Sequence, residues 1–268
     1  MRRDDRPYDP AECEDELEAV ESQWTAIWKG LGQRSVQDLD AVRKRPEFEI
    51  MWPYLQRLPE GSRILDGGCG MGEFAVWLTR HGYPTTGLDI SRETIGHLRK
   101  AYPDIEFAVG DIRATGFEDG SYDAYFSWGT FEHFEDGLGR AVEESYRLLR
   151  PGGYLFVSTP FDNLRHALHG TLRGPWRLAP QREPTRFYQW RLTRGELARA
   201  LAREGFAVEE VHAIHKRHGA HRWLRQALGV DLGTTFGRVA SGALSVILPA
   251  AVIAHMILAV ARKPEAKK

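Results

Sequence analysis

The residues with the clearest chemical meaning lie in the stretch ILDGGCGMGEF, at 64–74. Three glycines follow its apolar run in a GxGxG pattern: Gly68, Gly70 and Gly72. Glycine permits positive φ and lets a ligand touch bare backbone. Asp66 precedes the glycines, and Glu73 stands where the dinucleotide fingerprint needs its last glycine. Since carboxylates repel phosphate, the pattern favours a cationic, amino-acid-like ligand over a nucleotide diphosphate.

Two further acids follow apolar runs later in the chain. Asp89, in TTGLDIS, is placed to accept the hydroxyl protons of a ribose, and Asp111, in FAVGDI, to accept from an adenine amino group. Ile90 and Ile112 follow these acids and could sandwich the adenine ring. A single aspartate at such a place is more often a turn or helix cap. The three acids with the glycine loop together predict a pocket for S-adenosylmethionine.

The three acids and the glycine loop can form one site only if a sheet brings the ends of their strands to the same edge. Apolar runs at 63–67, 85–90, 105–109, 122–128 and 154–159 predict strands. Helical stretches at 72–81, 92–101 and 138–149 separate them. Strand and helix in alternation predict an α/β fold, with a mainly parallel sheet covered on both faces. Ligands bind such sheets beyond the carboxyl ends of the strands, where the acids stand.

The motifs ILDGGCGMG, LDIS, GDI, SYDAYFSWGTFEHFED and LRPGGYLFVSTP occur in this order between residues 64 and 160. In order and spacing they resemble the class I S-adenosylmethionine-dependent methyltransferases, especially the small-molecule type 11 group. The resemblance implies a Rossmann-like, doubly wound, seven-stranded sheet with helices on both faces. That sheet is mostly parallel, and its last strand, matched here by MILAVARK, runs antiparallel beside the fifth.

The resemblance also assigns roles to residues of this chain. It places Asp66 and Gly68 against the methionine part of the cofactor and Asp89 against the ribose, and Gly70 and Ile90 are counted among the cofactor-binding residues. Asp111 and Ile112 would bind the adenine, and the backbone of Ser127 would line the pocket. The resemblance implies S-adenosyl-L-methionine as the cofactor and no metal, and the two cysteines, Cys13 and Cys69, lack a metal-binding spacing.

Four segments are expected along the chain. Residues 1–60 predict an amphipathic helical cap, whose Trp24 and Trp28 we interpret as a core stripe rather than a substrate platform. Residues 61–160 form the cofactor-binding core, and 161–192 an irregular lid over the substrate. Residues 193–268 complete the core with a capped helix at 194–204, a strand in FAVEEVHAIHK, a second helical insertion at 217–254 and the last strand.

The acceptor region offers a candidate base. Methyl transfer needs an aligned nucleophile and, for a hydroxyl, removal of its proton. His133 in FEHFED has a suitable pKa, although it could instead cap or pack the next helix, and we expect Glu132 to be structural. SWGT at 127–130 replaces the Asn/Asp-Pro-Pro-aromatic motif of enzymes that methylate nucleobase amines.

The lid is basic and aromatic. Seven arginines and two acids lie between residues 161 and 194. This composition suits an anionic or hydroxylated acceptor with an apolar or ring portion, such as a phenol, a glycan intermediate or a phosphorylated lipid. Tyr188, His166 and Arg186 are the candidate substrate residues. A solvated basic surface loop is the alternative interpretation.

Residues 239–261 contain no Asp, Glu, Lys or Arg. Pro249 splits this run, which favours a buried helix followed by a core strand over a membrane span. The basic cluster at 215–226 leaves open a peripheral contact with anionic lipid through residues 212–261. The charged N-terminus predicts no secretory signal, and the few cysteines favour a reducing, cytoplasmic location.

The sequence therefore favours a methyltransferase that acts on a small molecule, more readily on oxygen than on carbon or nitrogen. With 36 basic and 37 acidic residues, no nucleic-acid partner is expected. A methyltransferase directed at RNA or protein, and a non-catalytic cofactor-binding protein that acts through a partner, remain alternatives. Nothing in the sequence indicates an oligomeric state.

Overall fold

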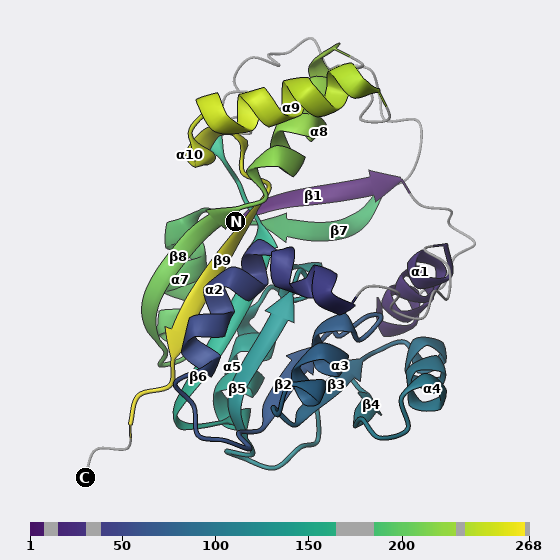
Figure 1. Ribbon diagram of the computed structural model, residues 1–268, viewed down its shortest axis with the longest axis vertical. Helices are drawn as coiled ribbons and strands as arrows, with labels where there is room; N and C mark the ends of the chain where they lie inside the picture. The colour runs from purple at the N-terminus through teal and green to yellow at the C-terminus, as the bar shows by residue number, and fades with distance from the viewer. Residues whose placement is uncertain (8–15, 31–38, 165–184, 229–233, 266–268) are drawn as a thin grey trace.

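The computed structural model describes residues 1–7, 16–30, 39–164, 185–228 and 234–265. Figure 1 shows a twisted central sheet with helices on both sides, and a group of helices beyond one end of it. The sheet has seven strands in the order β4-β3-β2-β5-β6-β9-β8. These strands are β2 (Ile64–Gly67), β3 (Thr85–Asp89), β4 (Phe107–Val109), β5 (Tyr122–Trp128), β6 (Leu149–Pro160), β8 (Ala207–Ile214) and β9 (Met256–Arg262).

The pairing confirms the predicted fold class. β2 pairs in parallel with β3 and β5, β3 with β4, and β5 with β6. The last strand, β9, runs antiparallel to both of its neighbours, with Phe156 of β6 opposite Val260. β4 is shorter and β6 longer than their apolar runs predict. All parallel strands therefore end at the same edge, where the candidate acids lie.

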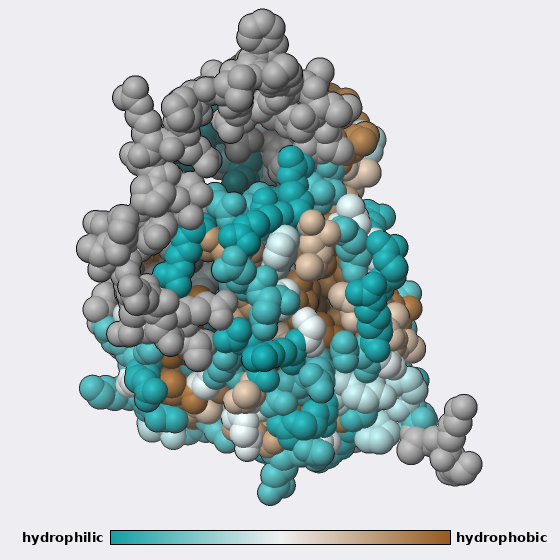
Figure 2. Space-filling model, turned by 180° about the vertical axis from the view of Figure 1, so that it is seen from behind, coloured by the Kyte–Doolittle hydropathy of each residue, from teal (hydrophilic) through white to brown (hydrophobic). Residues whose placement is uncertain are grey.

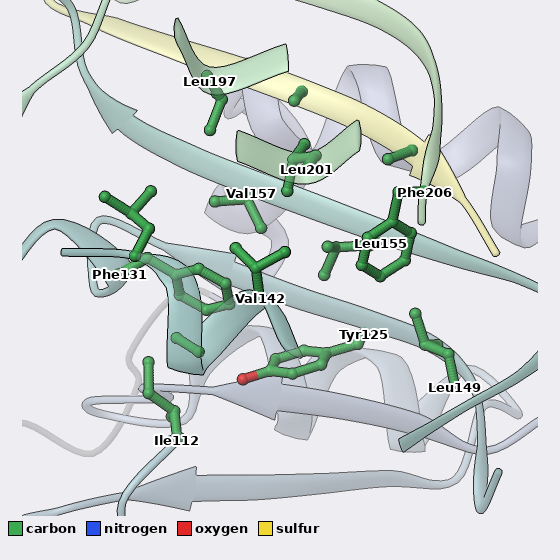
Figure 3. Close-up of a cluster of buried hydrophobic side chains, with 14 of the residues drawn as sticks. Ile112, Tyr125, Phe131, Val142, Leu149, Leu155, Val157, Leu197, Leu201 and Phe206 are labelled. Carbon is green, nitrogen blue, oxygen red and sulfur yellow. The ribbon is translucent and has the colours of Figure 1, made fainter. Parts of the chain in front are cut away.

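Helices bury both faces of the sheet, because its strands carry apolar side chains on both sides. The helices are α2 (Pro46–Leu55), α3 (Glu73–Arg80), α4 (Arg92–Ala101), α5 (Gly139–Leu148) and α7 (Arg194–Arg203). α2 and α3, with the short η1 (Leu39–Lys44), pack on one face against residues such as Phe126 and Phe156. α5 and α7 cover the other, where Val142 and Leu201 meet Tyr125 and Leu155 (Figure 3). α4 packs beside β4 through Ile95 and Leu98.

A second, two-stranded sheet differs from the sequence prediction. β1 (Arg2–Pro7) pairs antiparallel with β7 (Thr185–Arg191), although the first was expected in a helical cap and the second in an irregular lid. The charged RRDDRP carries no apolar alternation, so only its partner far along the chain makes it a strand. His166, in the remainder of the predicted lid, lies outside the described residues.

The predicted second insertion is helical. It contains α8 (Lys216–Leu228), α9 (Thr235–Ile247) and α10 (Ala250–Ile253). Pro249 is the N-cap of α10 and follows the end of α9, so residues 239–261 form a helix, a short helix and then β9. The predicted order of helix and strand is confirmed, but the prediction that the helix is buried is wrong, because Val239, Val246 and Ile247 of α9 are exposed. Among the residues described, every helix is too short or too polar to cross a bilayer.

Candidate cofactor and acceptor site

The glycine loop between β2 and α3 is built on left-handed backbone. The φ angles of Gly68, Gly70 and Gly72 are +80°, +50° and +71°, a region that glycine enters without steric cost. The N–H groups of Gly68 and Cys69 both donate to the carbonyl of Leu88, at 2.7 and 2.9 Å. Gly70 donates to Asp89. These loop N–H groups are therefore used internally, which disfavours the phosphate cradle of a dinucleotide site.

Asp66 stands where β2 meets the glycine loop. Its side chain is buried, and burial raises the pKa of the carboxyl well above its usual range, with the charge of Asp89 raising it further. A backbone hydrogen bond from Ala75 and the charge of Arg45 only partly offset this. A positively charged ligand at this edge would stabilise the ionised carboxylate, since an opposite charge favours the charged form.

Asp89 lies at the end of β3, as predicted, and its carboxylate is fixed at both oxygens. Oδ2 accepts from the backbone N–H of Gly70 at 2.9 Å, and Oδ1 accepts from that of Ser91 at 2.9 Å. Burial raises the pKa of Asp89 and these bonds lower it. A carboxylate has about four lone-pair sites, and Gly70 and Ser91 use two of them. Two acceptor sites therefore remain for two ribose hydroxyls.

The third acid lies at the predicted strand end but is engaged differently. The carboxylate of Asp111 accepts hydrogen bonds from Arg113. The Nε of Arg113 lies 3.1 and 3.3 Å from the two carboxylate oxygens, and its backbone N–H donates to one of them at 2.9 Å. An adenine amino group would share this carboxylate with a guanidinium. Ile112 is only 3% exposed and packs in the core cluster with Leu65 and Leu88, whereas Ile90 is half-buried. Ile90 is thus better placed than Ile112 to offer apolar surface to a ligand.

The bare backbone of the loop is approached by the protein's own side chains. A Cβ on Gly68 would lie 2.3 Å from the hydroxyl of Thr130, and one on Gly70 would lie 2.7 Å from the ring of Trp28. Trp28 belongs to α1 (Glu16–Gly30), and its indole Nε1 is buried without a hydrogen-bond partner in the described structure. The glycines therefore make room for α1 and Thr130, and α1 forms a wall over the loop.

Further contacts anchor α1 across the candidate site. The hydroxyl of Thr25 hydrogen-bonds that of Ser91 at 2.8 Å, and Glu21 accepts from the backbone N–H of Arg92 at 3.2 Å. Trp24 stacks on Trp28, with ring centroids 5.5 Å apart. The tryptophans predicted as a core stripe thus pack over the glycine loop and the start of α4. Their W-x-x-x-W spacing was visible in the sequence, but what they cover was not.

His133 ends η2 (Phe131–His133), just beyond β5. Its Nδ1 lies 2.8 Å from the carbonyl oxygen of Tyr188 in β7. Because a carbonyl only accepts, Nδ1 carries the hydrogen and Nε2 of the neutral ring carries the lone pair. The ring lies edge-on to Trp24, at 5.0 Å, and to Tyr188, at 5.2 Å. The structure therefore brings together the candidate base, α1 and one candidate substrate residue. Arg186 is half-buried on the same strand as Tyr188.

Glu132, which the sequence suggested only as structural, is a buried acid next to His133. It is 2% exposed, and its Oε2 has no hydrogen-bond partner in the part of the chain described. Burial raises its pKa to about 8, although the charge of Arg191 lowers it somewhat. At neutral pH this carboxyl is therefore mostly protonated and can donate a hydrogen bond. A buried charge has no signature in a single sequence, so only the packing shows it.

Ser127 lies within β5 and is fully buried. Its hydroxyl donates to the carbonyl of Gly67 at 2.6 Å, which ties β5 to the end of β2. The side chain of Ser127 therefore has a structural role, and the expectation that its backbone lines the site stays a prediction. The described residues contain no group of three or more His, Cys, Asp or Glu side chains able to hold a metal.

Comparisons with known proteins agree with this geometry. Residues 65–157 match a family described as "Methyltransferase domain". The chain is 30% identical over 172 residues to a "Probable S-adenosylmethionine-dependent methyltransferase" of Mycolicibacterium smegmatis, covering 64% of this chain and 62% of that protein. It is 32% identical over 155 residues to a "Ubiquinone biosynthesis O-methyltransferase" of Methylocella silvestris, covering 56% and 59%. The chain thus spans about three fifths of the length of these relatives.

A solved structure extends the match in space. The crystal structure of an S-adenosylmethionine-dependent methyltransferase from Mesorhizobium loti superposes with a TM-score of 0.51 at 25% identity. It covers 79% of this chain and 97% of the other. Over the methyltransferase-domain match at residues 65–157, the chain is therefore similar to S-adenosylmethionine-dependent methyltransferases.

Proposed function

We propose that the protein binds S-adenosyl-L-methionine and moves its methyl group to a hydroxyl of a small molecule. The observation that carries this proposal is the edge formed by β2 and β3. There the charge of Asp89 raises the cost of ionising the buried Asp66, while Asp89 itself is oriented by the backbone of Gly70. Two carboxylates with internally bonded loop N–H groups suit a ligand with a positive charge and free hydroxyls.

The cofactor supplies a methyl group already activated on a sulfonium. The chain's residues do the rest by holding and aligning the reactants. Asp66 would face the ammonium of the methionine part, and Asp89 would accept the ribose hydroxyls with its remaining lone pairs. Trp28 and the rest of α1 would exclude water from the loop, which strengthens each electrostatic contact inside.

His133 would take the proton of the acceptor hydroxyl on Nε2. Its Nδ1–H donates to the carbonyl of Tyr188, which fixes the tautomer and stabilises the ring once it is charged. Tyr188 and Arg186, both on β7, would contact the acceptor. The hydroxyl of a phenol suits this base, because its pKa near 10 leaves it protonated at neutral pH but removable.

The acceptor that the site supports best is a ring carrying a hydroxyl, which agrees with the name of the Methylocella silvestris relative, a "Ubiquinone biosynthesis O-methyltransferase". A glycan or a lipid-linked intermediate with a free hydroxyl fits the same base. The experiment is incubation of the protein with S-adenosylmethionine labelled in the methyl group and fractionated host extract. Label in a small-molecule fraction, lost in a His133→Asn variant, supports the proposal. Label confined to RNA or protein, or no transfer, contradicts it.

We also propose that α9 rests on an anionic membrane surface. Phe236, Val239, Val246 and Ile247 are 66–82% exposed along this helix, and Figure 2 shows apolar surface at the upper edge, where the helix ends. From Val211 to Pro264 the only acid is Asp231. An exposed apolar stripe beside basic residues is typical of helices that lie in a membrane interface.

Vesicle co-sedimentation tests this contact. The protein should pellet with phosphatidylglycerol vesicles and less with phosphatidylcholine vesicles. A Val246→Asp/Ile247→Asp variant should lose binding, whereas Ala101→Asp, an exposed position at the end of α4, should keep it. Equal pelleting of both variants, or none by the unaltered protein, would contradict a membrane role for α9.

A further inference from the structure

Two arginines outside the cofactor edge, Arg191 and Arg222, interact electrostatically, and Arg222 also interacts with Tyr188, whose carbonyl binds His133. Arg191 ends β7 and is 6% exposed. Its Nε donates to Asp4 of β1 at 2.5 Å, but its Nη1 is buried without a hydrogen-bond partner among the described residues. A buried guanidinium donor left unpaired costs free energy, because it has lost its water without replacement. Such a donor points to a ligand that supplies the missing acceptor.

Arg222 of α8 faces the same place. It is half-buried, and within the described part of the chain it makes no hydrogen bond or ion pair. Burial lowers its pKa, and the charge of Arg191 lowers it further, whereas Tyr188 and Asp4 raise it. Arg222 therefore shares its surroundings with Arg191 and with the residue that holds His133. Two guanidiniums in the same surroundings repel each other; Asp4 offsets part of this repulsion, and a bound anion would offset more of it.

The backbone fixes α8 in this position. Gly219 in α8 lies so near the carbonyl of Ile253 that a Cβ would come within 1.6 Å of it. This contact brings His218 against His255, with ring centroids 4.7 Å apart. Asn163, at the end of β6, donates to the carbonyl of Ala254 at 2.8 Å and holds the other side of the segment. Close backbone packing therefore fixes the position of α8, which carries Arg222 and His218.

The charges at this place do not balance at neutral pH. Arg191, Arg222 and Arg225 are the arginines whose charges act on one another here, and Arg2 lies opposite Arg191 in β1. The acids that interact with Arg222 and Arg191 are Asp4 and Glu132. Glu132 is mostly protonated, since its pKa is about 8, so of these two acids only Asp4, which pairs with Arg191, is charged. Burial and the nearby arginine lower the pKa of His255 to about 2, so it adds no charge of its own. The charges of this group are therefore net positive, which favours an anionic partner.

We propose that Arg191 and Arg222, with His255 beside them, bind an anionic oxygen group of the methyl acceptor, a carboxylate or a phosphate. This inference rests on the proposed function and names the acceptor class: a molecule with a hydroxyl for His133 and an anionic group for the two arginines. Guanidinium forks pair with either group through parallel N–H donors.

Inorganic phosphate and acetate serve as the probes, with binding measured by calorimetry. Arg222→Met is the informative variant, because Arg222 holds no other residue in place. Arg225→Met, on the exposed side of the same helix, is its matched control. Binding of S-adenosylhomocysteine is measured in parallel on all three proteins.

We expect the unaltered protein and Arg225→Met to bind at least one probe equally, and Arg222→Met to bind it at least tenfold more weakly, with S-adenosylhomocysteine affinity unchanged in all. The probe bound more tightly by the unaltered protein identifies the group as phosphate or carboxylate. Failure to bind either probe, or equal binding by Arg222→Met, would overturn the anion site. Failure of the unaltered protein to bind S-adenosylhomocysteine would overturn the proposed function and leave the anion site standing.

Discussion

The carboxylate of Asp89 accepts a hydrogen bond from the backbone N–H of Gly70 at 2.9 Å. This bond ties the end of β3 to the loop that follows β2, so the two strand ends that would hold the methionine and the ribose are one unit. The loop's left-handed backbone at Gly70 is held by the same bond.

Asp89→Ala should therefore weaken cofactor binding. It removes the acceptor for two ribose hydroxyls and releases Gly70 and Ser91, which leaves buried donors unpaired at a cost of roughly 1–3 kcal/mol. Calorimetry with S-adenosylhomocysteine should show a loss of about tenfold to a hundredfold. Asp104→Ala, an exposed acid before β4, is the matched control and should bind normally. An unchanged affinity in folded Asp89→Ala protein would show that the ribose lies elsewhere.

His133→Asn should slow methyl transfer without weakening the cofactor. General base catalysis contributes about 10²- to 10⁴-fold, and asparagine keeps polarity at this place while it cannot take the proton. The measurement is turnover on the labelled acceptor, beside S-adenosylhomocysteine affinity. His97→Asn, on α4, controls for the loss of an imidazole. If turnover falls less than a few-fold in His133→Asn, the histidine packs the site and is no base.

Glu132 should make the protein less stable as pH rises. Its folded pKa of about 8 lies above its ordinary value of 4.5, so the folded state binds the proton more tightly than the unfolded state. Stability contributed by this group is therefore lost between about pH 4.5 and pH 8. Glu132→Gln removes this titrating group. The free energy of unfolding of the variant minus that of the unaltered protein, measured by denaturant unfolding, should therefore be larger at pH 8.5 than at pH 5. The same difference at both pH values would contradict a buried, titrating Glu132.

Gly219→Ala should disrupt the packing of α8. The new Cβ would collide with the backbone carbonyl of Ile253, which cannot move aside as a flexible side chain would. We expect the free energy of unfolding to fall by about 1–3 kcal/mol, as is typical of an overpacked site, with a lower melting temperature. Gly242→Ala, in α9, is the matched control, because nothing lies within 4 Å of its Cβ. Gly242→Ala should gain up to about 1 kcal/mol from helix propensity. Equal behaviour of the two variants would contradict the close contact.

Much of this architecture follows from local pattern. The run of apolar segments predicts the order of strands, and Pro249 predicts where the last helical run ends, because proline cannot continue a helix. Asp66 and Asp89 lie at strand ends because a parallel sheet brings those ends together. These features depend on residues near each other in the chain, so the sequence carries them.

Other features depend on partners far along the chain. β1 is a strand only because it pairs with β7, and RRDDRP alone gives no sign of it. Asp111 is bound by Arg113, and Ile112 packs in the core, since their side-chain directions follow from the final packing. Arg191 and Arg222 come from separate elements, so no spacing in the sequence joins them.

The central claim is that the edge formed by Asp66, the glycine loop and Asp89 holds the adenosyl sulfonium beneath α1. The most direct measurement is a crystal structure of the protein with S-adenosylhomocysteine. We predict density across Gly68 and Gly70, with both ribose hydroxyls on Asp89 and Trp28 closing over the ligand. A structure at saturating ligand in which Trp28 and Thr130 still fill this edge, with the ligand absent or bound elsewhere, would contradict the claim.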